Sequence, residues 1–193
     1  MPFFRKSAPS DPLAVTMAGV KLGDRFLAIG LADPPLTAAL AAKVGLTGRA
    51  AAVDADEARV KNGAAAIERD GVLIEATRAP WGMLPFDDSS FDVVVVRDVL
   101  MELPPQARTL AGGEALRVLR PGGRIVVIEA APRGGLIGAL LNRQQSDPDY
   151  AASGGAVTTL TRAGFVAVRQ LAEHEGDVFV EGIKKAVHSE PFT

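Results

Sequence analysis

The feature that most restricts the fold is a run of six residues, FDVVVV, at positions 91–96. The four valines follow one another with no alternation between apolar and polar positions. Such a run is typical of a strand that is buried on both faces, as in a parallel sheet covered by helices on each side. Residues 91–96 therefore predict a central strand of an α/β sheet.

The rest of the first two thirds of the chain alternates short apolar runs with longer helix-like stretches. This alternation implies right-handed crossovers and a parallel sheet with helices on both sides. We expect further strands at residues 25–30, 49–53, 72–76 and 124–129, helices at residues 35–44, 57–68 and 105–119, and a turn at residues 120–123.

The last third changes character. A helix is expected at residues 153–163, followed by strands at residues 165–171 and 178–183. Only a short turn at residues 175–177 joins the two strands, and a parallel return would need a dozen or more residues. The two strands must therefore be antiparallel, which predicts an open α/β sheet whose last strand is reversed.

Length and composition are those of one soluble globular domain. The chain has 193 residues, of which 48% are hydrophobic, and carries a formal net charge of −2. This charge gives no general attraction to nucleic acid, so no nucleic-acid partner is expected, although a local basic patch stays open. We interpret residues 1–19 as an N-terminal arm, residues 20–185 as the domain and residues 186–193 as a tail.

Several classes of chemistry are excluded or disfavoured. The chain has no cysteine and two histidines, which excludes disulfides and thiolate catalysis and disfavours an imidazole-built metal site. No apolar run approaches the roughly 20 residues of a membrane-spanning helix. The N-terminus has no apolar segment behind its charges, so no secretory signal is expected. These observations predict a cytoplasmic protein without a membrane span.

The first two expected strands end at Gly30 and Asp54. In an open parallel sheet, ligands bind outside the carboxyl ends of the strands. A glycine there lets the backbone approach a ligand, and an acidic residue ending the next strand can accept hydrogen bonds from a ribose diol. The alternative is that both residues merely serve to turn the chain.

The order of several motifs resembles the class I S-adenosylmethionine-dependent methyltransferases, especially the small-molecule "methyltransferase 11" type. The resemblance extends over about residues 20–184 and implies a Rossmann-like, doubly wound sheet of roughly seven strands with the last one antiparallel. It also implies S-adenosylmethionine as cofactor and a small-molecule or lipid-like acceptor. The motifs are GDRFLAIG at residues 23–30, Asp54, LPFDDSSFDVV at residues 84–94, LRVLRPGGR at residues 116–124 and AGF at residues 163–165.

Two cofactor motifs depart from the family pattern. The family's acidic-x-Gly-x-Gly-x-Gly motif falls on Ala28, Gly30, Ala32 and Pro34, so only one glycine is kept. A Gly-Asp-Ala motif, whose Asp lies near the adenine amino group, falls on residues 79–81 (APW), which lack that carboxylate. The resemblance leaves the ribose to Asp54.

Other candidate residues allow two interpretations each. Asp33 faces the amino end of the cofactor or, as we favour, caps the helix that begins at Pro34. Trp81 stacks on adenine or fills space, and Arg97 contacts the cofactor or forms a surface ion pair with Asp98. The predicted cofactor-binding set is Gly30, Ala32, Asp33, Asp54, Pro80, Trp81 and Arg97.

No catalytic residue is predicted, because methyl transfer mainly requires the acceptor, methyl group and sulfur to be aligned. Tyr150 lies where the family often builds its acceptor pocket, but we favour an ordinary loop aromatic. The apolar segment at residues 134–141 (GGLIGALL) lines an acceptor pocket or forms a homodimer contact.

Three functions are therefore compared. The favoured hypothesis is methyl transfer from S-adenosylmethionine. The second is a catalytically inactive interaction or regulatory domain of the same fold, which the altered motifs favour. The third, a nicotinamide-dependent oxidoreductase, ranks low. Residues 30–35 (GLADPP) lack two phosphate-loop glycines, and Asp33 stands at a helix start that should attract anions.

Overall fold

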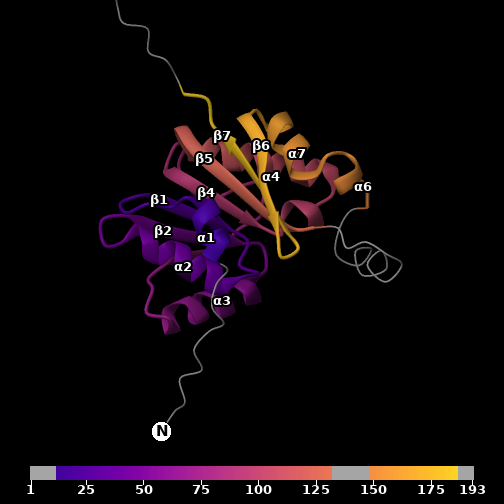
Figure 1. Ribbon diagram of the computed structural model, residues 1–193. Coiled ribbons are helices and arrows are strands. Elements are labelled where there is room, and N and C mark those ends of the chain that lie inside the picture. The colour runs from indigo at the N-terminus through magenta and orange to yellow at the C-terminus, as the bar shows by residue number, and fades with distance from the viewer. Residues whose placement is uncertain (1–11, 132–147, 187–193) are drawn as a thin grey trace, which may run out of the picture.

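The computed structural model describes residues 12–131 and 148–186. These residues form one seven-stranded sheet with the order β3-β2-β1-β4-β5-β7-β6 (Figure 1). Strand β7 is antiparallel to both of its neighbours, and the other pairings are parallel. The predicted α/β fold with a reversed last strand is confirmed. The strands are β1 (Arg25–Ile29), β2 (Arg49–Asp54), β3 (Glu75–Arg78), β4 (Phe91–Arg97), β5 (Leu119–Ala130), β6 (Val166–His174) and β7 (Asp177–Ile183).

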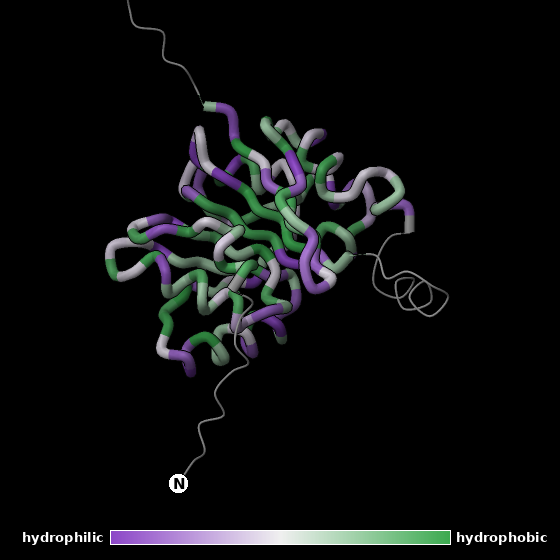
Figure 2. The backbone as a smooth tube through the Cα atoms, viewed as in Figure 1, coloured by the Kyte–Doolittle hydropathy of each residue, from purple (hydrophilic) through white to green (hydrophobic). Residues whose placement is uncertain are grey.

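Helices cover both faces of the sheet, and the buried middle segments of its central strands are mainly apolar (Figure 2). Alternate residues of each strand enter opposite cores: Val94 and Val96 belong to one, Val93 and Val95 to the other. One face carries α1 (Pro12–Ala18), α2 (Pro34–Val44) and α3 (Glu57–Arg69). The other carries α4 (Pro105–Val118), α6 (Pro148–Ala152) and α7 (Gly155–Ala163), and the 3-10 turn η1 (Leu100–Glu102) follows β4.

Several predicted elements have different bounds, and for three of them the structure shows the reason. Strand β3 lies at Glu75–Arg78 rather than 72–76, because it pairs with β2 at the edge of the sheet and its exposed side chains leave no apolar signal. Strand β5 includes the predicted turn at 120–123, because Leu119 already pairs with Phe91 before a register shift. The helix expected at 153–163 begins instead at Gly155, because the preceding Gly154 has a φ of 95° that no regular helix accommodates.

Part of the predicted N-terminal arm belongs to the folded body. Residues 12–18 form α1, which buries Ala14 and Ala18 in the same core as α2. The division into arm, domain and tail stays a prediction. The apolar segment at residues 134–141 lies outside the described residues.

The two most specific motifs of the sequence are joined by Arg117. Its guanidinium donates hydrogen bonds to the carbonyl oxygens of Leu84 (3.0 Å) and Phe86 (2.8 Å) and forms ion pairs with Asp88 and Glu114. Glu114 in turn accepts the backbone N–H of Leu84. The loop that follows β3 is therefore fixed on α4, which determines where the loop stands at the carboxyl edge of the sheet.

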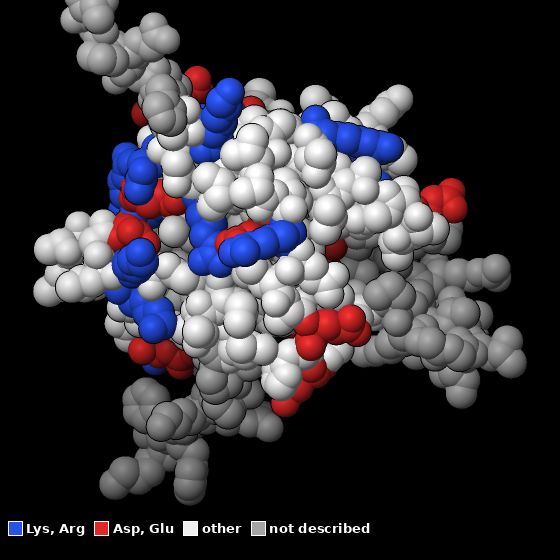
Figure 3. Space-filling model, turned by 45° about the horizontal axis from the view of Figure 1, so that its top comes forward, with Lys and Arg blue, Asp and Glu red and all other residues white. Residues whose placement is uncertain are grey.

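Charged side chains on the visible face of the molecule lie largely beside partners of opposite sign (Figure 3). Arg25 and Arg120 both pair with Asp92, and Arg124 and Arg169 both pair with Glu181. Within residues 12–131 and 148–186, no helix is long and apolar enough to cross a bilayer. The same residues contain no cluster of three or more acidic, histidine or cysteine side chains suited to a metal ion.

Candidate functional site

Asp54 is the last residue of β2, and its side chain is completely buried at the carboxyl edge of the sheet. One carboxylate oxygen accepts the backbone N–H of Leu31 at 2.9 Å, and the other accepts the backbone N–H of Asp56 at 2.9 Å. The carboxylate thus joins the loop after β1 to the start of α3. Each oxygen has a second lone pair, so further hydrogen bonds from a ligand hydroxyl can be accepted.

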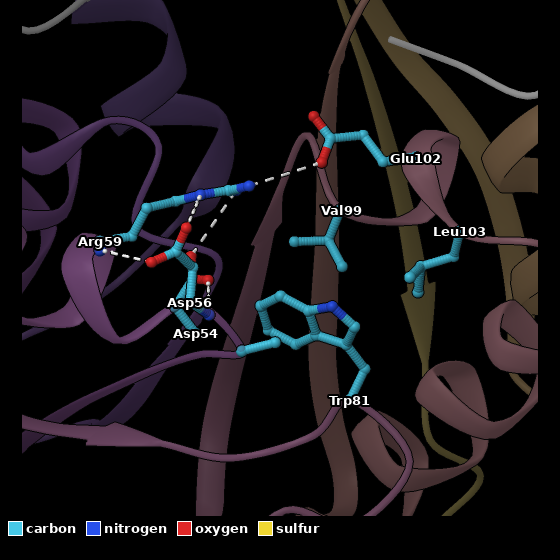
Figure 4. A pocket seen from close by; sticks show the side chains of 8 residues that line it. Asp54, Asp56, Arg59, Trp81, Val99, Glu102 and Leu103 are labelled. Carbon is cyan, nitrogen blue, oxygen red and sulfur yellow. Dashed lines mark hydrogen bonds and ion pairs between the residues drawn. The ribbon is translucent and has the colours of Figure 1, made fainter.

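A cavity of about 310 Å³ lies beside this carboxylate (Figure 4). Its volume is at the lower end of the roughly 300–1,000 Å³ that small-molecule sites occupy. The lining comes from the end of β2, from α3, from the loop after β3 and from the segment after β4, all at the edge where open α/β sheets bind ligands. The lining residues are Asp54, Ala55, Asp56, Arg59, Trp81, Val99, Glu102 and Leu103.

Arg59 extends from α3 across the charged side of the cavity (Figure 4). Its nitrogens lie 3.9 Å from carboxylate oxygens of Asp54, Asp56 and Glu102. These separations are ion pairs rather than hydrogen bonds, so the guanidinium balances three carboxylates without saturating them. Burial raises the pKa of Glu102, and the positive charge of Arg59 opposes this shift.

The remaining wall is apolar. Val99 is buried, whereas the indole of Trp81 and the side chain of Leu103 are half-buried and pack against the same core. An apolar wall opposite a carboxylate matches the two sides of a nucleoside, which has a flat base and a hydroxylated sugar. The residues present therefore fit a nucleoside.

The loop after β1 does not line this cavity. Gly30 has a φ of 93°, and a Cβ there would stand 2.6 Å from the carbonyl oxygen of Arg97 and 2.7 Å from a methyl group of Val99. Its close approach is therefore to β4. Asp33 accepts the backbone N–H of Leu36 at 3.0 Å, which confirms the predicted helix cap. Ala32 is exposed.

Arg97 also lies outside the lining. Its guanidinium is 2.5 Å from a carboxylate oxygen of Asp177 and 3.0 Å from one of Asp98. Burial favours the neutral guanidine, but the hydrogen bond that Arg97 donates to Asp177 prevails and raises the pKa of Arg97. The Arg97–Asp98 pair is thus half-buried and joins β4 to the β6–β7 hairpin. Pro80 is exposed beside the cavity wall.

Of the predicted binding residues, the structure brings Asp54 and Trp81 to the cavity. The cofactor contacts of the whole predicted set stay a prediction. Sequence reasoning missed six lining residues. Asp56 had a usable signal, since an Asp two residues after a strand end is a good helix cap, and it does accept the N–H groups of Ala58 and Arg59. The others carry no local signal: Ala55, Arg59, Val99, Glu102 and Leu103.

Our interpretation of Tyr150 as an ordinary loop aromatic is wrong. Tyr150 belongs to α6, is buried, and donates its hydroxyl to a carboxylate oxygen of Glu129 at 2.8 Å. The guanidinium of Arg108 lies 4.2 Å from the centre of its ring. Burial raises the pKa of Glu129 to about 7, against the hydrogen bonds from Tyr150 and from the backbone of Met101.

Fold and site together define an α/β protein of the doubly wound kind with a cavity that suits a nucleoside. The family model described as "Methyltransferase domain" matches residues 27–127, more than half of the chain. The chain therefore belongs to this family, that of the class I S-adenosylmethionine-dependent methyltransferases, whose cofactor is S-adenosylmethionine.

Individual relatives agree with this assignment. The chain is 31% identical over 117 residues to "Ubiquinone/menaquinone biosynthesis C-methyltransferase UbiE" of Idiomarina loihiensis, which covers 60% of this chain and 46% of that protein. The chain thus spans about half the length of the curated relatives it matches. A "SAM dependent methyltransferase" from Aquifex aeolicus superposes with a TM-score of 0.73 at 18% identity, covering 89% of this chain and 88% of the other. A putative methyltransferase from Bacillus halodurans gives 0.67 at 15%, covering 90% and 98%.

Proposed function

We propose that this chain binds S-adenosylmethionine with the adenosine part in the cavity beside Asp54 and transfers the methyl group to a small acceptor. The observation that carries the proposal is the position of the Asp54 carboxylate, at the end of β2 and in the wall of a nucleoside-sized cavity. A carboxylate in this place is suited to accept hydrogen bonds from the two ribose hydroxyls.

Each side of the cavity has a separate task in this proposal. Asp54 accepts hydrogen bonds from the ribose hydroxyls. The apolar surfaces of Trp81 and Val99 contact adenine, either on its faces or at its edge. Glu102 offers a second carboxylate on the charged side, paired like Asp54 with Arg59, in a chain where Pro80 stands in place of the carboxylate typical of the family. When bound, S-adenosylmethionine supplies an activated methyl group on its sulfonium, so the residues of the chain need only hold and orient the reactants.

We further propose that the acceptor is lipid-like and carries a quinol-type ring. The support is the similarity to enzymes that are named as C-methyltransferases of ubiquinone and menaquinone biosynthesis. Because the matched segment is 46% of such a relative, the acceptor does not follow from family membership alone. A cytoplasmic location and the absence of a nucleic-acid partner are part of the same proposal, supported by the net charge of −2.

Isothermal titration calorimetry of the full chain with S-adenosylhomocysteine tests cofactor binding. We expect one site with a Kd on the order of micromolar, and the absence of heat at millimolar ligand would contradict the proposal. Methyl transfer is then measured with isotopically labelled S-adenosylmethionine and a short-chain quinol that lacks the ring methyl group. Label in a quinol of the matching mass supports the acceptor class, and label in none of the quinols offered contradicts it.

One observation favours the second function, a catalytically inactive domain that binds another macromolecule. Asp54 is completely buried, and each of its oxygens already accepts a backbone N–H. If these bonds serve only to hold the loops together, the folded chain will bind no nucleoside. Calorimetry with adenosine separates the two functions, because the inactive domain gives no heat while its circular dichroism spectrum stays that of the folded chain.

A further inference from the structure

The turn η1 supplies one wall of the cavity, since Val99, Glu102 and Leu103 flank or belong to it. The backbone of this turn is held from α4. Arg108 donates one hydrogen bond to the carbonyl oxygen of Leu100 (2.9 Å) and another to that of Leu103 (2.6 Å). One buried guanidinium thus bonds both ends of the turn.

The middle of the turn is held from β5. A carboxylate oxygen of Glu129 accepts the backbone N–H of Met101 at 3.0 Å, and the other oxygen accepts the hydroxyl of Tyr150 at 2.8 Å. Glu129 and Tyr150 are buried, with 7% and 5% of their surface exposed. The ring of Tyr150 lies under the guanidinium of Arg108, so the three side chains form one connected group.

Burying such a polar group costs free energy, so its presence indicates a structural purpose. Burying a carboxylate costs free energy, which hydrogen bonds must offset, and apolar side chains of similar size would pack here without that cost. Here three hydrogen bonds of the group end on the backbone of a single short turn, at Leu100, Met101 and Leu103. Hydrogen bonds have directions that apolar packing lacks, so they fix the shape of this turn.

We infer that Glu129, Tyr150 and Arg108 are positioning residues, which hold η1 in the shape that places Glu102 and its neighbours in the cavity wall. Because Tyr150 belongs to α6, the position of this helix is coupled to the shape of the cavity through Glu129. That the three side chains hold η1 concerns the turn alone. That they thereby affect ligand binding rests on the proposed function.

Amide hydrogen exchange followed by NMR tests the local part in the full chain. In Glu129→Ala, the Met101 amide loses its acceptor, and we expect it to exchange about tenfold faster. In Glu129→Gln, the side-chain carbonyl can accept the same N–H, so the slow exchange should return. The amides of Val94 and Val127, in the centre of the sheet, serve as reference. An unchanged Met101 rate in Glu129→Ala, or an equal acceleration at Val94 and Val127, would overturn the inference.

Tyr150→Phe tests the coupling to the cavity, with Thr161→Ala as matched control. Thr161 also loses a hydroxyl, but this hydroxyl is exposed on α7 and bonds only to the carbonyl of Val157 in its own helix. We expect Tyr150→Phe to weaken S-adenosylhomocysteine binding about three- to tenfold and to shift the emission of Trp81, the single tryptophan of the chain. Thr161→Ala should change neither.

These experiments distinguish a failure of the coupling from a failure of the proposed function. If the wild type binds the ligand and Tyr150→Phe binds it equally well, the coupling is wrong and the proposed function stands. If the wild type binds no ligand, the proposed function fails. The exchange rate of Met101 and the emission of Trp81 then still decide whether the group holds the turn.

Discussion

The carboxylate of Asp54 accepts the backbone N–H of Leu31 at 2.9 Å, which joins the end of β2 to the loop that follows β1. The resemblance described above places Ala32 and Pro34 at positions where the family usually has glycines. Glycines would permit the shape of this loop. In their absence, the hydrogen bond between Leu31 and Asp54 fixes it. Asp54 therefore has a structural task in addition to the binding task that we propose for it.

Replacing Asp54 should lower both stability and affinity. Asp54→Ala removes the acceptor of the buried amide of Leu31 and of the partly buried amide of Asp56, and an unsatisfied buried amide costs about 1–3 kcal/mol of unfolding free energy. Asp54→Asn keeps one carbonyl oxygen and should be less destabilised. Urea unfolding and calorimetry with S-adenosylhomocysteine measure the two effects, and we expect at least a tenfold loss of affinity for both variants, on the order of the 1.5–3 kcal/mol of a charge-assisted hydrogen bond.

Glu57→Gln is the matched control for these variants. Glu57 is an exposed carboxylate in the first turn of α3, three residues from Asp54, and it does not line the cavity. Its replacement should leave affinity unchanged and stability within about 0.5 kcal/mol. Full affinity in Asp54→Asn would show that the carboxylate only holds the loops.

Trp81→Ala should weaken nucleoside binding. An aromatic side chain stacked on a base contributes about 1–3 kcal/mol, so the Kd of S-adenosylhomocysteine should rise about tenfold or more. Met83→Ala, in the same loop, removes a side chain that is 70% exposed and outside the lining, and should leave the Kd unchanged. If both variants bind like the wild type, adenine does not contact the indole.

The decline of the unfolding free energy below pH 4 should depend on Asp92. Burial raises the pKa of Asp92, but hydrogen bonds from the side chain and backbone of Arg25 and from Arg120 prevail and lower it from 3.8 to about 2. A lowered pKa in the folded state stabilises the protein above pH 4, and this contribution is lost as the pH falls from about 4 to 2.

Asp92→Asn should therefore lose about 2 kcal/mol of unfolding free energy at pH 7, with a flatter decline below pH 4. Asp87→Asn, an exposed carboxylate of the neighbouring loop, should follow the wild-type curve. Denaturant unfolding between pH 2 and 7 measures both variants. If the unfolding free energy of Asp92→Asn declines below pH 4 as steeply as that of the wild type, Asp92 does not cause this decline.

Glu129 should act in the opposite direction. Burial is the largest cause that raises its pKa from 4.5 to about 7. Between these values the folded chain keeps a proton that the unfolded chain releases, so the unfolding free energy falls as the pH rises from 4.5 to 7. Relative to Glu129→Gln, which has no such proton, the wild type should lose up to about 3 kcal/mol over this interval. A constant difference between the two proteins would contradict the raised pKa.

Sequence reasoning succeeded where one residue and its neighbours determine the outcome. The valine run at residues 93–96 predicted a strand covered on both faces, and Asp33 before Pro34 predicted a helix cap. It failed for the edge strand β3, whose exposed residues have no apolar pattern, and for Glu102, which reaches the cavity through the packing of η1. The prediction for Tyr150 was wrong because its hydrogen-bond partner, Glu129, lies 21 positions earlier in the chain.

A crystal structure of the full chain with S-adenosylhomocysteine would decide whether Asp54 binds the ribose. We expect ribose hydroxyl oxygens within hydrogen-bond distance of the Asp54 carboxylate, roughly 2.5–3.0 Å, and adenine against Trp81. Ligand bound elsewhere, or no ligand beside Asp54 at saturating concentration, would contradict this expectation.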